Sequence, residues 1–69
     1  QLLAELAEHE GLHRERLAEY RLSEARYLAM TKTQRAPFRL PYLTLRRGIL
    51  YEEDWLRWLD EARLELTQG

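Results

Sequence analysis

The chain has 69 residues and no cysteine, and its formal net charge is −1, with 45% hydrophobic and 33% charged residues. Such a length supports one domain at most, with a core too small for much stability. The lack of cysteine excludes disulfides and thiolate metal sites and fits a reducing cytosol, so we expect a cytoplasmic protein without a cofactor. Because charges balance and no apolar run approaches about 20 residues, we expect neither electrostatic nucleic-acid binding by the chain as a whole nor a membrane span.

The first predicted element is a long helix over residues 2–29. The segment is rich in Leu, Ala, Glu and Arg, contains no proline, and has Gly11 as its one weak helix former. One seam of side chains advances alternately by three and four residues, the spacing that keeps one face of a helix against a partner helix. The seam comprises Leu3, Leu6, Glu10, His13, Leu17, Tyr20, Glu24 and Tyr27.

Three members of this seam, Glu10, His13 and Glu24, are polar. Polar residues inside a helical seam cost stability but fix register and partner orientation. We expect them either to pair across a hairpin with Arg63 or Arg46, or to lie at the rim of the interface. The sequence favours neither.

The segment 30–40 is predicted to connect two helices without being helical itself. It contains β-branched threonines and Pro37. A residue that precedes a proline avoids the α region, so Ala36 and Leu40 should be extended or turning.

A second helix is predicted over residues 41–66, with Pro41 at its first position. The alternation over residues 42–46 also allows an irregular start, although an isolated strand would leave its backbone unpaired. Gly48 could be a tolerated weak point of the helix, but we interpret it as a point of close approach for a bulky side chain or a second helix. A second seam again alternates steps of three and four residues, and a stripe on a neighbouring face is also apolar. The seam comprises Tyr42, Leu45, Ile49, Glu52, Leu56, Leu59, Arg63 and Leu66, and the stripe Tyr51, Trp55, Trp58 and Ala62.

These elements predict an all-α fold, an antiparallel two-helix hairpin that forms one domain over residues 1–69. So small a chain cannot cover both apolar faces of its second helix, so we expect a second copy to do so, giving a four-helix arrangement. The predicted hairpin or dimer interface consists of Leu6, Leu17, Tyr20, Tyr27, Leu45, Gly48, Ile49, Tyr51, Trp55, Leu56, Trp58 and Leu59.

Residues 9–13, His-Glu-Gly-Leu-His, match the H-E-x-x-H pattern of zinc hydrolases. A zinc site would need a third ligand, and the candidate is Glu24. It would lie roughly 16 Å further along the same helix, too far to bind the same metal. The alternatives are adventitious metal binding or a polar helical interface, and we predict the interface. No catalytic or metal-binding residue is therefore assigned.

Two further clusters allow a functional interpretation and a structural one. Six basic residues and no acidic one lie between Ala25 and Tyr51, and they could form a patch that contacts phosphate. Alternatively, Arg46 and Arg47 pair with acidic residues 52–54 or are solvated. The tryptophans of the stripe could stack on a planar ligand, but aromatic residues at helical spacing more often anchor a core or an interface. The six basic residues are Arg26, Lys32, Arg35, Arg39, Arg46 and Arg47.

A long Leu-, Glu- and Arg-rich predicted helix is followed by a second one that carries a characteristic set of positions: Leu43, Leu45, Gly48, Tyr51, Trp58 and Leu59. In these features, most of the chain resembles the C-terminal helical domain of PadR-like transcriptional regulators, the virulence-activator-alpha type. The resemblance implies that the hairpin joins two subunits, that an N-terminal winged helix-turn-helix reads DNA, and that a small-molecule effector is a further partner in some members. No recognition helix is present in these 69 residues, so the chain is interpreted as a fragment.

The function predicted from the sequence is dimerisation, with a role in effector sensing, in a bacterial PadR-like regulator. The partners expected are a second copy, DNA through a separate N-terminal domain, and an effector, but no membrane. The alternative from another class is a small helical adaptor or inhibitor that binds a different protein through the same apolar faces. A zinc hydrolase is the remote third.

Overall fold

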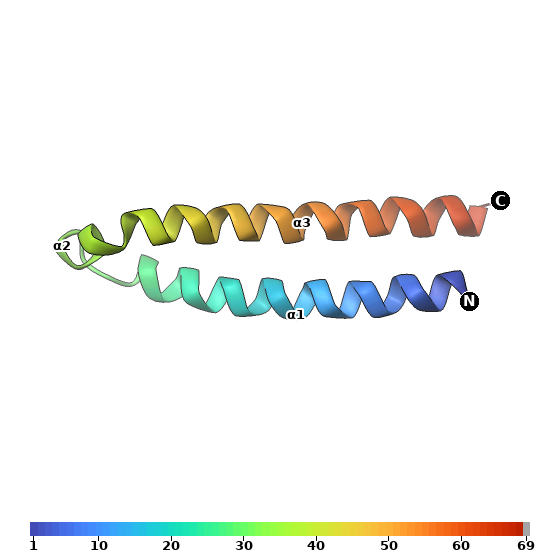
Figure 1. The fold of residues 1–69 in the computed structure, drawn as a ribbon, viewed down its shortest axis with the longest axis horizontal. Helices are drawn as coiled ribbons and strands as arrows, with labels where there is room; N and C mark the ends of the chain where they lie inside the picture. The colour runs from blue at the N-terminus through green and yellow to red at the C-terminus, as the bar shows by residue number, and fades with distance from the viewer. Residues whose placement is uncertain (69) are drawn as a thin grey trace.

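A computed structural model describes residues 1–68 of the chain. It contains two long antiparallel helices, α1 (Leu2–Leu28) and α3 (Arg39–Gln68), joined by the short helix α2 (Lys32–Arg35) and a 3₁₀ turn (Ala36–Phe38). The hairpin is a rod of 54 × 15 × 14 Å, with both chain ends at one end and α2 at the other (Figure 1). The predicted all-helical hairpin is therefore confirmed for the described residues.

The helices begin and end close to the predicted positions. The side chain of Gln1 caps α1 by accepting the backbone N–H of Ala4 at 2.8 Å, although glutamine is not a favoured N-cap residue. Residues 42–46 lie inside α3, so the alternative of an irregular start is wrong. Pro41 is the third residue of α3, where its missing N–H removes no intrahelical hydrogen bond.

The prediction for the connection was wrong, because most of it is helical. The Thr31 side chain accepts a hydrogen bond from the backbone N–H of Gln34, and the Gln34 side chain accepts one from the backbone N–H of Thr31. This capping box starts α2. Ala36 adopts φ −49° and ψ −48° despite the proline that follows it, and Leu40 lies inside α3. Local hydrogen bonding and the helix-compatible φ of proline outweigh the steric preference of the residue before proline.

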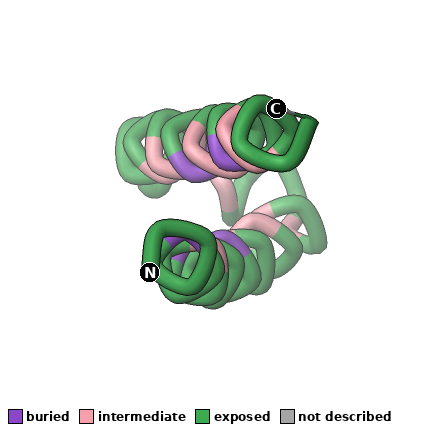
Figure 2. Tube along the Cα trace, turned by 90° about the vertical axis from the view of Figure 1, so that its right-hand side faces the viewer, coloured by how far each residue is buried: buried purple, intermediate pink, exposed green. Residues whose placement is uncertain are grey.

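The core of the hairpin is narrow. Within residues 1–68, the buried hydrophobic residues are Leu6, Leu17, Ile49 and Leu59, and two polar side chains, His13 and Glu52, are buried with them. Viewed along the rod, the buried positions lie where the two helices face each other, and the outward sides are exposed (Figure 2). All six belong to the predicted seams.

Gly48 allows the two helices to approach closely. A Cβ at this position would lie 3.2 Å from Cε2 of Tyr20 on the opposite helix. The predicted close approach of a bulky side chain is confirmed, and that side chain is the ring of Tyr20.

Candidate interaction surface

Polar residues of the two seams meet in three layers along the hairpin. Near the chain ends, Glu10 forms an ion pair with Arg63. In the middle, His13 pairs with Glu52. Near the turn, Arg46 donates to Glu24 at 3.0 Å. The predicted pairing across the hairpin with Arg63 or Arg46 is correct for Glu10 and Glu24. His13 also pairs across the hairpin, but with Glu52. Such layers fix which residues face each other.

The middle layer is the most enclosed. The side chains of His13 and Glu52 are 8% and 3% exposed, and a hydrogen bond joins Nδ1 of the histidine to Oε2 of the carboxylate. The His13 ring stacks on Trp55 with centroids 4.9 Å apart. An Arg16 nitrogen lies 4.0 Å from the other carboxylate oxygen, so this oxygen also faces a cation. The sequence placed His13 in the seam but left open whether it was buried, and it did not identify Glu52 as its partner.

This layer also bears on the H-E-x-x-H match. The buried His13 pairs with Glu52 and stacks on Trp55, whereas His9 is exposed. Within residues 1–68, no three His, Cys, Asp or Glu side chains gather as a metal site would require. The match therefore has a structural use in the hairpin, through Glu10 and His13.

The turn end is held by aromatic and basic side chains. Tyr27 and Tyr42 stack with ring centroids 4.0 Å apart. Arg35 donates to the backbone oxygens of Tyr27 and Leu28, at 3.2 and 2.6 Å, and its guanidinium lies 5.3 Å from the centroid of the Tyr27 ring. Arg35 therefore caps the C-terminal end of α1, a role that the sequence did not indicate.

Tyr42 links this stack to the third polar layer. Its hydroxyl donates to Glu24 at 3.1 Å, and Arg46 donates to the same carboxylate oxygen. Loss of solvent raises the pKa of Tyr42, and the hydrogen bond to Glu24 and the charge of that carboxylate raise it further, against an opposing effect of Arg46.

Two of the six basic residues between Ala25 and Tyr51 have structural partners: Arg35 and Arg46. The pairing of Arg46 with acidic residues 52–54 is wrong, because its partner Glu24 comes from the other helix. The remaining four form no ion pair within residues 1–68 and are exposed. They are Arg26, Lys32, Arg39 and Arg47.

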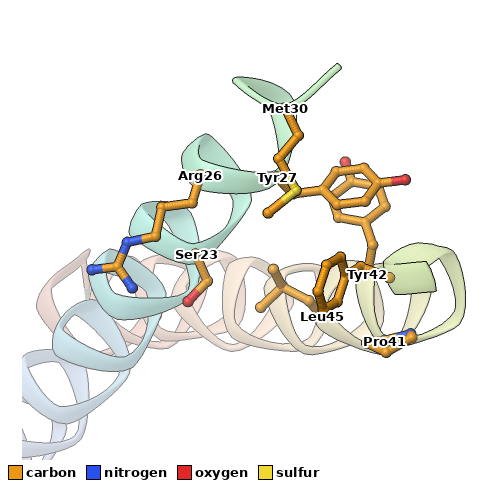
Figure 3. A pocket seen from close by; sticks show the side chains of 8 residues that line it. Ser23, Arg26, Tyr27, Met30, Pro41, Tyr42 and Leu45 are labelled. Carbon is orange, nitrogen blue, oxygen red and sulfur yellow. The ribbon is translucent and has the colours of Figure 1, made fainter. Parts of the chain in front are cut away.

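Two shallow hollows lie along the hairpin. The turn-end hollow, of about 320 Å³, is lined by Ser23, Arg26, Tyr27, Met30, Phe38, Pro41, Tyr42 and Leu45 (Figure 3). The open-end hollow, of about 230 Å³, is lined by Leu2, Glu5, Leu6, His9, Trp55, Trp58 and Leu59.

Both hollows open on the same face of the hairpin. Residues seven apart fall on almost the same line along a helix. On α1 this line joins His9 of the open-end hollow to Ser23 of the turn-end hollow, and on α3 it joins Trp55 to Pro41. We refer to this side as the hollowed face. The large apolar residues that line its hollows include Leu2, Phe38, Trp55 and Trp58. Leu12 and Tyr51 extend it, since they lie seven residues from the lining residues Glu5 and Trp58.

The residues predicted for the interface divide between the hairpin core and this outer surface. Leu6, Leu17, Ile49 and Leu59 are buried within the hairpin, while Tyr51 and Trp58 are 58% and 51% exposed. The others are half-buried: Tyr20, Tyr27, Leu45, Gly48, Trp55 and Leu56. The prediction omitted four apolar residues of the hollowed face: Leu2, Leu12, Met30 and Phe38. The seven-residue spacing of positions 2, 9, 16, 23 and 30 could have indicated Leu2 and Met30.

These features define a helical-hairpin domain, which pairs its polar seam residues internally and leaves apolar side chains on its outer surface. The chain belongs to the Virulence activator alpha C-term family, which it matches over residues 1–67. No curated protein and no solved structure matches it. None of the helices in residues 1–68 has the length and apolar character that crossing a membrane requires.

Proposed function

We propose that this chain is the dimerisation domain of a bacterial PadR-like transcriptional regulator, with a non-enzymatic role in the cytoplasm. Membership of a virulence-activator family supports a role in gene regulation. DNA would be read by a separate winged helix-turn-helix, and the dimer would set the distance between two such domains. A small-molecule effector would act by changing this geometry.

The observation that carries the proposal is the imbalance between buried and exposed apolar residues. Four hydrophobic residues are buried in the hairpin, whereas thirteen large hydrophobic residues are exposed within residues 1–68. Isolated exposed leucines are ordinary, but apolar side chains gathered on one face mark an interaction site. Five of the thirteen lie together on the hollowed face: Leu2, Leu12, Phe38, Tyr51 and Trp58. Two hairpins joined by their hollowed faces would supply the burial that one hairpin lacks.

Sedimentation equilibrium over a dilution series tests the proposal. We expect a dimer that persists at low concentration. We further expect Trp58→Ala to dissociate it, because truncation of a large buried aromatic residue costs about 3–5 kcal/mol. Trp58 is a sharper probe than Trp55, because Trp55 also stacks on His13 inside the hairpin.

Leu50→Ala is the matched control. Leu50 is 56% exposed, close to the 51% of Trp58, but lies on the other flank of α3. It should leave the dimer intact. A wild-type chain that remains monomeric throughout the series would contradict the proposal and favour an adaptor that binds a different protein. Equal effects of the two substitutions would contradict the choice of the hollowed face.

A further inference from the structure

We infer that the two copies join antiparallel, hollowed face to hollowed face, so that the turn end of each copy lies on the open end of its partner. The inference rests on the proposed function, because it specifies how the proposed dimer is arranged. Its two-fold axis would be perpendicular to the rod, near the middle of both helices.

The charge of the hairpin is divided along its length. The half that contains the turn, residues 16–53, has eight basic and four acidic side chains, a formal charge of +4. The half that contains the chain ends, residues 1–15 and 54–69, has three basic and eight acidic side chains, a formal charge of −5. A parallel pair would place like charges side by side along the rod, whereas an antiparallel pair places opposite charges together.

The hollowed face carries this division at specific positions. Arg26 lines the turn-end hollow and Glu5 lines the open-end hollow, and neither forms an ion pair within residues 1–68. The two residues are 21 positions apart, three times seven, so they fall near the same line along α1. They are also equidistant from the middle of α1, at residues 15 and 16. An antiparallel two-fold axis at this point brings Arg26 of each copy to Glu5 of the other.

The size of the face fits one partner of the same dimensions. A surface 54 Å long and 15 Å wide projects to about 800 Å², which matches what each partner buries in a standard stable interface. A second copy placed lengthwise covers this surface completely. A parallel copy would cover it equally well, so the charges decide the direction.

The direction can be measured with spin labels, because the natural chain contains no cysteine. Single-cysteine variants Thr33→Cys, in α2 at the turn end, and Thr67→Cys, at the open end, take one label each at exposed positions. Dipolar spectroscopy should give same-site distances approaching the 54 Å length of the rod. A mixture of the two labelled variants should add a short distance, from heterodimers. Short same-site distances and a long mixed distance would overturn the inference.

Charge reversal provides an independent test. We expect Arg26→Glu or Glu5→Arg to raise the dimer Kd by about tenfold, because two attractive contacts become repulsive in each dimer. The double variant, which carries both changes, should restore the Kd to near the wild-type value. In a parallel two-fold dimer, the positively charged turn ends of both copies would lie together, so the single Arg26→Glu change would leave the Kd unchanged or lower it, which would overturn the inference.

Arg47→Glu is the matched control, since it makes the same charge change at the same end but on the side of α3 that faces away from α1. Screening should hold its effect on the Kd below about twofold. Circular dichroism of every variant checks that the helices are retained. If the wild-type chain is monomeric, the proposed function fails; if it is a dimer with short same-site distances, only the antiparallel arrangement fails.

Discussion

His13 and Glu52, the buried polar side chains of the hairpin, lie next to each other. Burial of such a side chain costs free energy unless it is hydrogen-bonded. Removal of one partner would leave the other enclosed between the helices without its hydrogen bond. We expect Glu52→Ala to lower the free energy of unfolding by about 3 kcal/mol, because breaking a buried pair strands the remaining polar group. Urea unfolding at a fixed chain concentration measures this loss.

Two control variants test whether the loss of stability in Glu52→Ala comes from the buried pair or from the removal of any carboxylate. Glu53→Ala removes the neighbouring carboxylate, whose ion pair with Arg21 is exposed, and should cost less than about 1 kcal/mol. The double variant His13→Leu and Glu52→Leu should recover at least the wild-type stability, because apolar residues can replace a buried pair without loss. A Glu52→Ala effect no larger than that of Glu53→Ala would contradict the assignment.

The hydroxyl group of Tyr42 should make the turn end of the hairpin less stable at alkaline pH. Its pKa is raised in the folded hairpin by loss of solvent and by Glu24. The stabilisation that accompanies this shift is fully present below the unfolded pKa of about 10 and is lost as the pH rises through the higher folded value. We expect unfolding at increasing pH to show this loss, and Tyr42→Phe to remove this contribution. The tyrosinate absorbance of the two proteins should differ by one group that titrates late; a normal titration of that group would contradict the prediction.

At the scale of the helices, the two internal glycines have opposite surroundings. No atom lies within 4 Å of a Cβ built on Gly11, whereas a Cβ on Gly48 meets the Tyr20 ring. Gly11→Ala should therefore raise the free energy of unfolding by about 1 kcal/mol, the difference in helix propensity. Gly48→Ala should gain less or lose stability, because the ring must move. Thermal unfolding of both variants compares them directly, and equal gains would show that the close approach is unimportant.

The connection between the helices is the element that sequence reasoning described least well. A Thr-x-x-Gln capping box at residues 31–34 is readable from the sequence and could have predicted a helical turn. The helical conformation of Ala36 could not be predicted in the same way, since the residue preceding a proline disfavours it. Nor does any local pattern indicate that Arg35 reaches back to the end of α1.

For the molecule as a whole, the hairpin could be predicted because two long helices with seams of matching period are joined by a short connection. The pairing of Glu10 with Arg63 and of Glu24 with Arg46 was one of two open interpretations. On α3, Trp55 and Trp58 of the predicted stripe do line the hollowed face. Most residues of α1 that border this face were not identified, because they depend on how the helices rotate against each other. The spacing of three and four residues between seam positions restricts this rotation, but it does not determine which side chains beside the seam line the hollows.

Both chain ends lie at the same end of the rod, opposite the turn (Figure 1), and this determines how the hairpin responds to mechanical force. A pull on the two ends would load the interhelical contacts one after another, as in unzipping, rather than all at once, as in shear. The pair of Glu10 with Arg63 would open first, then the buried pair of His13 with Glu52, and the pair of Glu24 with Arg46 last. The enclosed central pair would thus act as the main resistance part of the way along the opening path, and the stacked tyrosines beside the turn would separate after it.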